Sequence, residues 1–361
     1  MRPRLWAALG GLVAVAVLPS AAQAATKSVS VGTPRPLQKT IQSTASDVND
    51  FFPHRVTIHV GDTVRFVPNG FHTVDLPRRG RTKKLALFVP TGQPVSGVLD
   101  AAGAPFWFNG QPRLGFNPRL AVSGFGKQRT YSGASSLNSG LPTGNRPKPM
   151  TVRFTRAGTY RYFCDVHYGM TGIVSVVRAG RRVPSAAQDR ATVNRQSAAA
   201  LRVAKGLAAK AEAPPQGPAN TVTVGLEGAG RVSWFGFAPA KLTVPVGTTV
   251  AYKIGARSEV HTATTGPGNP ETQPTSYLGQ LTASLESPAP DPRALYPSDP
   301  PPAPPALTPT FHGNGFWNTG GLDLDPGSPV PGANTVRFSA PGTYEVYCLI
   351  HPFMHQTVTV Q

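Results

Sequence analysis

The sequence contains very few cysteines and none of the common catalytic motifs. Only two cysteines, Cys164 and Cys348, occur among its 361 residues. They occupy matching positions in an internal repeat, so in two separate domains they are not expected to lie within disulfide reach. The Gly-x-Ser-x-Gly elbow, the phosphate-binding loop and the His-Glu-x-x-His pair are all absent. We therefore expect a protein that is not an enzyme.

Acidic residues are also scarce, and mainly in the first half. The chain has 17 Asp and Glu against 35 Lys and Arg, a net charge of +18. Residues 25–183 contain 22 basic and 6 acidic residues, whereas residues 220–361 contain 6 and 9. Such a basic segment suggests nucleic-acid binding, but no nucleic-acid module is recognisable, so none is expected. A basic face for an acidic partner, an anionic cell surface or the weakly acidic second half fits better.

Long apolar runs are absent except near the N-terminus. Residues 1–24 contain two arginines, an apolar run from Leu5 to Leu18, and the ending Ala22-Gln23-Ala24. This layout is typical of a cleavable secretory signal, with cleavage expected before Ala25. A membrane anchor is the alternative, but the apolar run is short for a span. We expect an exported chain, secreted or otherwise extracytoplasmic (periplasm or cell surface), with no transmembrane segment after cleavage.

What is present is a repeat with the period of β-strands. Residues 51–66 alternate between apolar and polar positions around a turn at Gly61-Asp62, and residues 237–252 repeat this pattern around Gly247. The repeat predicts two all-β domains, at residues 25–182 and 220–361. Residues 25–50 are expected to be a loose lead-in with one short strand near Ser28–Val31.

The segments between and within the repeats have other compositions. Residues 183–219 form an Ala/Arg-rich linker, in which Ser185–Glu212 shows no strand pattern and predicts a helix closed by Pro214-Pro215. Each domain also contains an insertion longer than a compact sandwich needs. The second insertion includes Pro288–Pro309, whose many prolines predict an extended surface loop.

Both cysteines begin the motif Cys-x2-His-x2-Met, and a further histidine follows the second strand of each repeat. The candidate metal ligands are therefore His72, Cys164, His167 and Met170 in the first domain, and His261, Cys348, His351 and Met354 in the second. Thiolate, imidazole and thioether are soft ligands that favour copper. Zinc is the competitor, but a thioether binds zinc poorly and structural zinc sites favour several cysteines. Each ligand alone could equally be a packing residue; the duplication of the whole set favours a metal.

Two histidines, a cysteine and a weak axial methionine make up a blue-copper electron-transfer centre. Such a rigid site suits neither Cu(I) nor Cu(II) fully, so the geometry changes little when the charge changes. We expect one copper ion, cycling between Cu(I) and Cu(II), in each domain.

On these motifs, both halves resemble the cupredoxins of the plastocyanin and azurin family, over residues of roughly 50–180 and 220–361. The short ligand loops are most similar to that of amicyanin. The resemblance implies Greek-key β-sandwiches, and it carries the eight ligands named above onto these positions. It also implies that His167 and His351 lie near the surface, each with an imidazole edge that serves as the electron port. The long insertions depart from the small members of the family.

Two-domain cupredoxin chains also include copper nitrite reductases and multicopper oxidases. Those enzymes hold a second kind of copper with His-x-His pairs and with a histidine beside the cysteine. This chain has no His-x-His pair, and neither cysteine has a histidine neighbour. The other histidines are scattered and are expected to be surface or packing residues: His54, His59, His312 and His355.

The sequence thus predicts an exported blue-copper protein that carries single electrons between redox partners, which include acidic proteins. The alternative is an extracytoplasmic protein for copper sequestration or delivery, which would use the same ligands but exchange the metal easily. A third hypothesis, a structural or adhesive protein, keeps the sandwiches and makes copper optional. The sequence does not indicate an oligomeric state.

Overall fold

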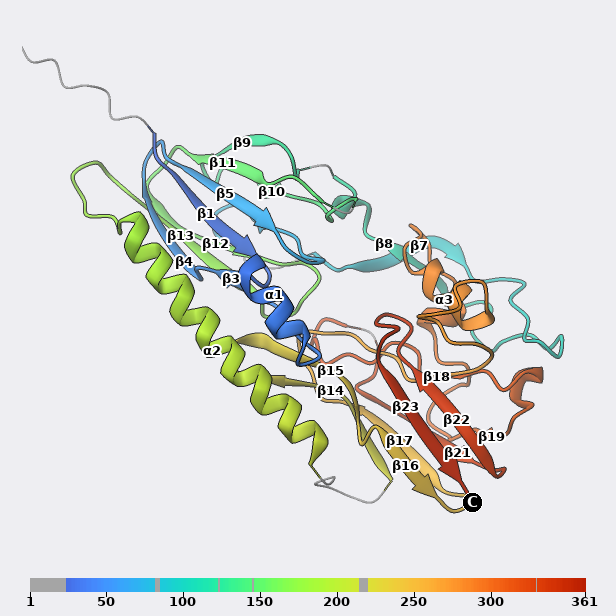
Figure 1. Ribbon diagram of the computed structural model, residues 1–361. Helices are drawn as coiled ribbons and strands as arrows, with labels where there is room; N and C mark the ends of the chain where they lie inside the picture. The colour runs from blue at the N-terminus through green and yellow to red at the C-terminus, as the bar shows by residue number, and fades with distance from the viewer. Residues whose placement is uncertain (1–23, 82–84, 123, 145, 214–219, 329) are drawn as a thin grey trace, which may run out of the picture.

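The alternating segments form two β-sandwiches that are joined by a long helix (Figure 1). The computed structural model describes residues 24–81, 85–122, 124–144, 146–213, 220–328 and 330–361. The predicted signal segment lies almost wholly outside the described residues, as do Pro214 and Pro215. No helix in the described ranges is both long enough and apolar enough to cross a membrane.

The first sandwich consists of two five-stranded sheets. One contains, in spatial order, β3 (Phe51–Phe52), β1 (Thr26–Val31), β5 (Thr63–Pro68), β11 (Met150–Phe154) and β9 (Gln128–Tyr131). The other contains β10 (Leu137–Asn138), β6 (Asp75–Leu76), β12 (Gly158–Phe163), β13 (Thr171–Val177) and β4 (Arg55–His59). Alternate residues point inward, so that Val64 and Phe66 pack with Val152, Tyr162 and Val174 in one core.

The second sandwich repeats this arrangement and adds one strand, β2, to the edge of one sheet. One sheet contains β19 (Ala306–Leu307), β21 (Ala333–Phe338), β17 (Thr249–Ile254), β14 (Thr221–Gly228), β15 (Val232–Ala238) and β2 (Ser46–Val48). The other contains β16 (Lys241–Val244), β23 (His355–Val360), β22 (Gly342–Tyr347), β18 (Thr264–Thr265) and β20 (Trp317–Asn318). Neighbouring strands are mostly distant in sequence because the chain crosses between sheets, as in Greek-key sandwiches. The predicted fold class, two tandem all-β sandwiches, is confirmed.

The strand expected near Ser28–Val31 is confirmed as β1, but the rest of the lead-in is not loose, so that part of the prediction is wrong. It contains helix α1 (Arg35–Gln42) and strand β2, which pairs with β15 of the second sandwich. Ile41 and Val48 are fully buried and pack with residues of the linker helix and of β15. Burial against a distant part of the chain orders this segment, and local sequence carries no signal for it. One sheet of the second sandwich therefore ends in a strand that comes from residues 25–182, the segment predicted to be the first domain. The boundaries of the two domains stay a prediction.

The predicted helical linker is confirmed as α2 (Ala186–Glu212). Ser185 caps its N-terminus and exchanges hydrogen bonds with Gln188, the pattern of a capping box. Ala200, Ala204 and Leu207 are buried on one side of the helix. The helix packs against β14 and β15 of the second sandwich and also contacts α1 and β2, so α2 fixes the two halves rather than acting as a flexible tether (Figure 1).

The insertion of the first half reaches across to the second half. Its hairpin, β7 (Phe88–Pro94) and β8 (Pro112–Phe116), leads into a segment in which Phe106 and Phe108 are buried with Leu281 and Leu349. Helices α3 (Tyr277–Ser284) and α4 (Pro292–Leu295) cover the same cluster. Through this cluster the two insertions hold the halves together beside Cys348. Short 3₁₀ helices lie at Pro118–Leu120, Ala229–Arg231 and Phe311–Gly313.

The proline-rich stretch is only partly the extended loop that the sequence predicts. Pro292 begins α4, where its missing N–H is not needed, and Asp291 caps that helix. Leu307 in β19 is fully buried and pairs with β21. The prediction overlooked that proline is compatible with the first turn of a helix and with the edge of a sheet.

Candidate metal centres

The same structural elements position the candidate ligands in both halves. His72 and His261 lie in the loops after β5 and β17, before the short strands β6 and β18. Cys164 and Cys348 follow directly after β12 and β22. In each half the ligand loop then returns through the next histidine and the methionine into the antiparallel partner strand. A strand-end histidine and a facing loop therefore meet at one end of each sandwich.

In the first half, His72, Cys164 and His167 turn three donor atoms toward one point. The two Nδ1 atoms are 2.9 Å apart, and Cys164 Sγ lies 3.6 Å from Nδ1 of His167 and 4.0 Å from Nδ1 of His72. All three side chains are buried.

The second half repeats the triangle with His261, Cys348 and His351. Its Nδ1 atoms are 3.1 Å apart, and Cys348 Sγ lies 3.8 Å from each of them. Within the described ranges, these two triads are the groups of His, Cys, Asp and Glu whose ligand atoms gather within 4.8 Å of one another.

These triangles have the dimensions of a trigonal metal site. Metal bonds of about 2 Å to nitrogen and about 2.3 Å to sulfur place donors roughly 3.3–3.8 Å apart at trigonal to tetrahedral angles. The measured edges lie close to that range in both halves, and the donor set of two imidazoles and one thiolate is that of a copper site. The residues therefore fit the ion that the sequence predicts.

Met170 and Met354 are buried at the end of each ligand loop, and their ligation is a proposal. Both side chains are buried, at 1% exposure each. The backbone closes the loop around them: Cys164 N donates to Met170 O over 3.0 Å, and Cys348 N donates to Met354 O over 3.3 Å. The methionines are thereby held next to the cysteines, among the core residues of each sandwich.

Burial favours the neutral forms of the triad side chains. It lowers the pKa of His72 and of His351 to about 4, and it lowers the pKa of His261 well below its usual value. Burial also raises the pKa of both cysteine thiols, although backbone N–H groups near each sulfur oppose this. The histidines are thus ready to bind a cation, whereas each thiol must release its proton to a metal.

A threonine that follows each strand-end histidine ties the two parts of the site together. Thr73 N donates to Cys164 Sγ over 3.4 Å, and Thr262 N donates to Cys348 Sγ over 3.3 Å. The threonine hydroxyl accepts the backbone N–H of the residue after the cysteine, Asp165 in one half and Leu349 in the other. These bonds hold the sulfur in place and stabilise negative charge on it.

No protein-family model matches the sequence, and no curated protein is significantly similar to it. Several solved structures match parts of the fold. They include the purple cupredoxin from Nitrosopumilus maritimus (17% identity, 40% of this chain, 100% of that one) and the oxidised plastocyanin from Dryopteris crassirhizoma (22%, 39% and 99%). A mutant amicyanin in its reduced Cu(I) form at pH 4 also matches (16%, 42% and 89%), and the TM-score is 0.21 in each case.

The chain is similar to cupredoxins. The resemblance that the ligand motifs predict is confirmed to this extent, over about 40% of the chain for each solved structure. Similarity of this degree does not identify what the chain binds, so the function is inferred from the geometry of the site.

Two glycines shape the histidine pockets, and the sequence analysis missed them. A Cβ atom on Gly32 would lie 2.5 Å from Nε2 of His72, and one on Gly225 would lie 2.5 Å from Nε2 of His261. Both have positive φ, +92° and +64°. Each follows a Val-x-Val sequence, Gly32 after the end of β1 and Gly225 at an irregularity within β14, and that repeated Val-x-Val-Gly could have revealed them. The glycine backbone packs against one edge of the imidazole and leaves Nδ1 facing the cysteine.

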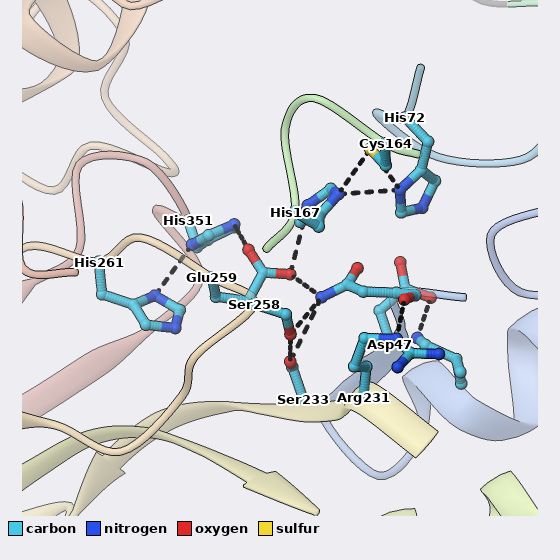
Figure 2. A network of polar contacts seen from close by, with 12 residues as sticks. Asp47, His72, Cys164, His167, Arg231, Ser233, Ser258, Glu259, His261 and His351 are labelled. Carbon is cyan, nitrogen blue, oxygen red and sulfur yellow. Dashed lines mark hydrogen bonds and ion pairs between the residues drawn. The ribbon is translucent and has the colours of Figure 1, made fainter. Parts of the chain in front are cut away.

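The resemblance implied loop histidines at the surface, and here the structure differs. His167 is only 7% exposed, and the side chain of His351 is only 19% exposed. Both turn their Nε2 atoms toward one buried carboxylate, that of Glu259 (Figure 2). Glu259 of the second half thus lies against the edge of His167 that the resemblance placed at the surface, whereas His351 stays partly exposed.

The surroundings of the two cysteines differ in charge. Asp165, directly after Cys164, accepts hydrogen bonds from Leu85 N (2.8 Å) and Asn138 Nδ2 (2.8 Å), and it lies beside Asp75. Burial and the neighbouring Asp165 carboxylate raise the pKa of Asp75 to about 7. In the second half, the corresponding position is Leu349, which is fully buried in an apolar cluster.

The remaining histidines lie away from both triads, as predicted. His54 contacts Asp50, His59 Nε2 donates to the carbonyl of Arg181, and His355 contacts Glu345. His312 lies between Asp100 and Asp299, at 2.9 Å and 3.4 Å, where the two insertions meet. Within the described residues these histidines belong to no metal-sized cluster.

Proposed function

We propose that the protein is an exported type 1 copper protein that carries single electrons between redox partners, with one copper ion in each half. The observation that carries the proposal is the triangle of two Nδ1 atoms and one Sγ, buried and repeated with nearly the same dimensions. The layout of residues 1–24 supports export, and no bond-making step is needed.

When bound, copper would supply a one-electron couple between Cu(I) and Cu(II). The residues of the chain would hold the ion, fix its ligands and exclude water. His72, Cys164 and His167 would hold the ion in a preset triangle, and His261, Cys348 and His351 would do so in the second half. The threonine N–H donors keep each sulfur in place, and burial excludes water. A site that is fixed from all sides has little to rearrange when its charge changes.

The burial of the ligands favours electron transfer over copper delivery. Delivery requires an open ligand that a partner can reach, but His72, Cys164, His261 and Cys348 are each at most 1% exposed. Electron transfer requires only that a redox partner contact the protein surface near the metal centre. At the second centre, Phe235 lies 4.8 Å from the ring of His351, and Phe353 is 51% exposed. This aromatic edge is the proposed contact with a redox partner, and the basic first half favours an acidic one.

Titration of the mature, metal-free protein with Cu(II) tests this function. We expect two equivalents to bind and to produce the intense visible absorption of a copper thiolate, because each site supplies one buried thiolate. Stopped-flow mixing with a redox protein and with a copper chelator then compares electron exchange with metal loss. Colourless binding, or metal loss that is faster than electron exchange, would replace the proposal with copper sequestration or delivery.

Replacement of Met170 or Met354 by leucine tests the axial ligands. Because the axial bond is weak, we expect copper to remain bound while the reduction potential of that centre changes. Leucine fills a similar volume, so the core should lose less than about 1.5 kcal/mol of stability. Potentiometric titration of each variant measures the change. Unchanged potentials in both variants would show that the methionines are only packing residues.

A further inference from the structure

One carboxylate lies between the two metal triads. Nε2 of His167 is 3.5 Å from Oε1 of Glu259, and Nε2 of His351 is 3.7 Å from Oε2 of the same side chain. Figure 2 shows the two rings on opposite sides of this carboxylate. Glu259 also precedes His261, a ligand of the second triad, by only two residues. A short path of side chains therefore runs from one centre to the other.

The chemistry of a metal-bound histidine gives this carboxylate a role. A histidine that binds a metal through Nδ1 keeps its proton on Nε2, and it usually donates that proton to a carboxylate or carbonyl. His167 and His351 both turn Nδ1 toward a cysteine and Nε2 toward Glu259. Glu259 thus lies within ion-pair distance of both rings, one on each oxygen, and is the candidate outer partner of two centres at once.

The path is held rigidly by the interface between the halves. Asn49, from the first half, donates to Glu259 Oε1 over 2.6 Å and contacts Ser258 and Ser233 of the second half. Arg231 bonds the carbonyl of Asn49 and pairs with Asp50. Strand β2 adds backbone pairing to β15 next to these contacts. The two centres therefore keep a constant separation.

The charges beside the cysteines give the path a direction. The Asp165–Asp75 pair places negative charge next to Cys164, whereas Leu349 and its apolar cluster surround Cys348. Negative charge stabilises the more positive, oxidised ion, and an apolar setting stabilises the less charged, reduced ion. The second centre should thus have the higher potential.

We propose that electrons pass inside the protein from the first centre to the second through His167, Glu259 and His351. This inference rests on the proposed function. In each event the reduced ion of the first centre loses one electron and the oxidised ion of the second gains it. No bond forms or breaks, and no proton is transferred. The chain is then a directional relay, which receives electrons on its basic half and releases them at the aromatic edge of the other half.

The test uses the full mature chain with copper in both sites. A substoichiometric pulse of reductant is followed by freeze-quench EPR, and C348S and C164S supply the reference spectra and potentials of the single centres. We expect the higher potential for the second centre. We also expect a redistribution phase whose rate does not depend on protein concentration, and E259Q should slow it by about 10–100-fold, the usual effect of losing an outer-shell partner.

Two further variants and one independent signal complete the test. E259D keeps a carboxyl group but withdraws it from both rings, so it should also slow the phase. E271Q removes an exposed acid of the same half and should leave the rate unchanged. The Nε2 proton resonances of His167 and His351 in the Cu(I) protein should shift in E259Q, independently of any electron transfer.

Different results would contradict different claims. Failure to bind copper or to form the coloured thiolate complex would overturn the proposed function. If both centres load and cycle, the relay alone is overturned by any of three results: a missing first-order phase, an unchanged rate in E259Q, or a higher potential at the first centre.

Discussion

Replacement of Cys348 by serine removes about half of the copper-thiolate absorption, because each half of the chain supplies one thiolate of its own. Cys164→Ser removes the other half. Serine is nearly the same size as cysteine, but its hydroxyl is a hard and weakly acidic ligand that does not replace a soft thiolate. The expected copper content falls from two ions to about one in each variant, and to about none in the double variant. Metal analysis and the optical spectrum measure both quantities.

The fold should survive these substitutions. Thr262 N, which donates to Cys348 Sγ, can donate to a serine hydroxyl instead, and Thr73 N can do so in the first half. A buried hydroxyl that lacks its other partner costs about 1–3 kcal/mol, which an independently packed sandwich can tolerate. Circular dichroism of the metal-free variants provides the control. Loss of all colour from a single substitution would mean that the two cysteines serve one shared site, against the two separate triangles seen here.

Much of the fold could be predicted from the sequence because the same pattern of strands and turns occurs in both halves of the chain. The turn around Gly61 recurs at Gly247, both with positive φ, and the strands on either side follow the period of two. The helix α2 could be predicted because its segment is alanine-rich and its cap is local, Ser185 with Gln188. These signals lie within a few residues of the elements that they specify.

Other parts of the fold depend on contacts that sequence distance hides. Strand β2 exists because Trp234 and its neighbours in β15 offer an open edge, almost 200 residues further along the chain. Leu307 is ordered by β21 in spite of the surrounding prolines. A pattern of about ten residues cannot predict pairing with a strand that is far away in the sequence.

The metal triads could be predicted for the same reason as the strands, since ligand type and spacing recur. Their neighbours could not. Glu259 looks like an ordinary acid in a loop, and only the docking of the halves places it between His167 and His351. The expectation of a loop histidine near the surface was wrong for His167 for the same reason: it described a single domain, and here Glu259 of the other half lies against the ring.

Substitution of Gly225 by alanine should damage the second metal centre more than its small size suggests. The new methyl group would lie 2.5 Å from Nε2 and 2.8 Å from Cδ2 of His261, a contact that the buried ring cannot avoid without moving Nδ1 away from Cys348. The positive φ of +64° adds strain of about 1–2 kcal/mol, and overpacking adds about 1–3 kcal/mol. We expect copper affinity at this centre to fall by about 10–100-fold, as when the support of a metal ligand is lost.

The chain supplies both controls for this prediction. Gly247→Ala introduces alanine at a φ of +87° with no atom within 4 Å of the new Cβ, so it measures the backbone strain alone. Its metal sites should be unaffected. Gly32→Ala repeats the clash at His72 and adds a closer one between the new Cβ and the backbone oxygen of Asn69, and each variant keeps the other centre as an internal reference. Copper titration followed at both centres, with thermal unfolding of the metal-free protein, separates lost affinity from lost stability. Equal copper binding in Gly225→Ala and Gly247→Ala would show that the ring of His261 does not depend on its glycine neighbour, and that the ligand triangle is set by the cysteine loop alone.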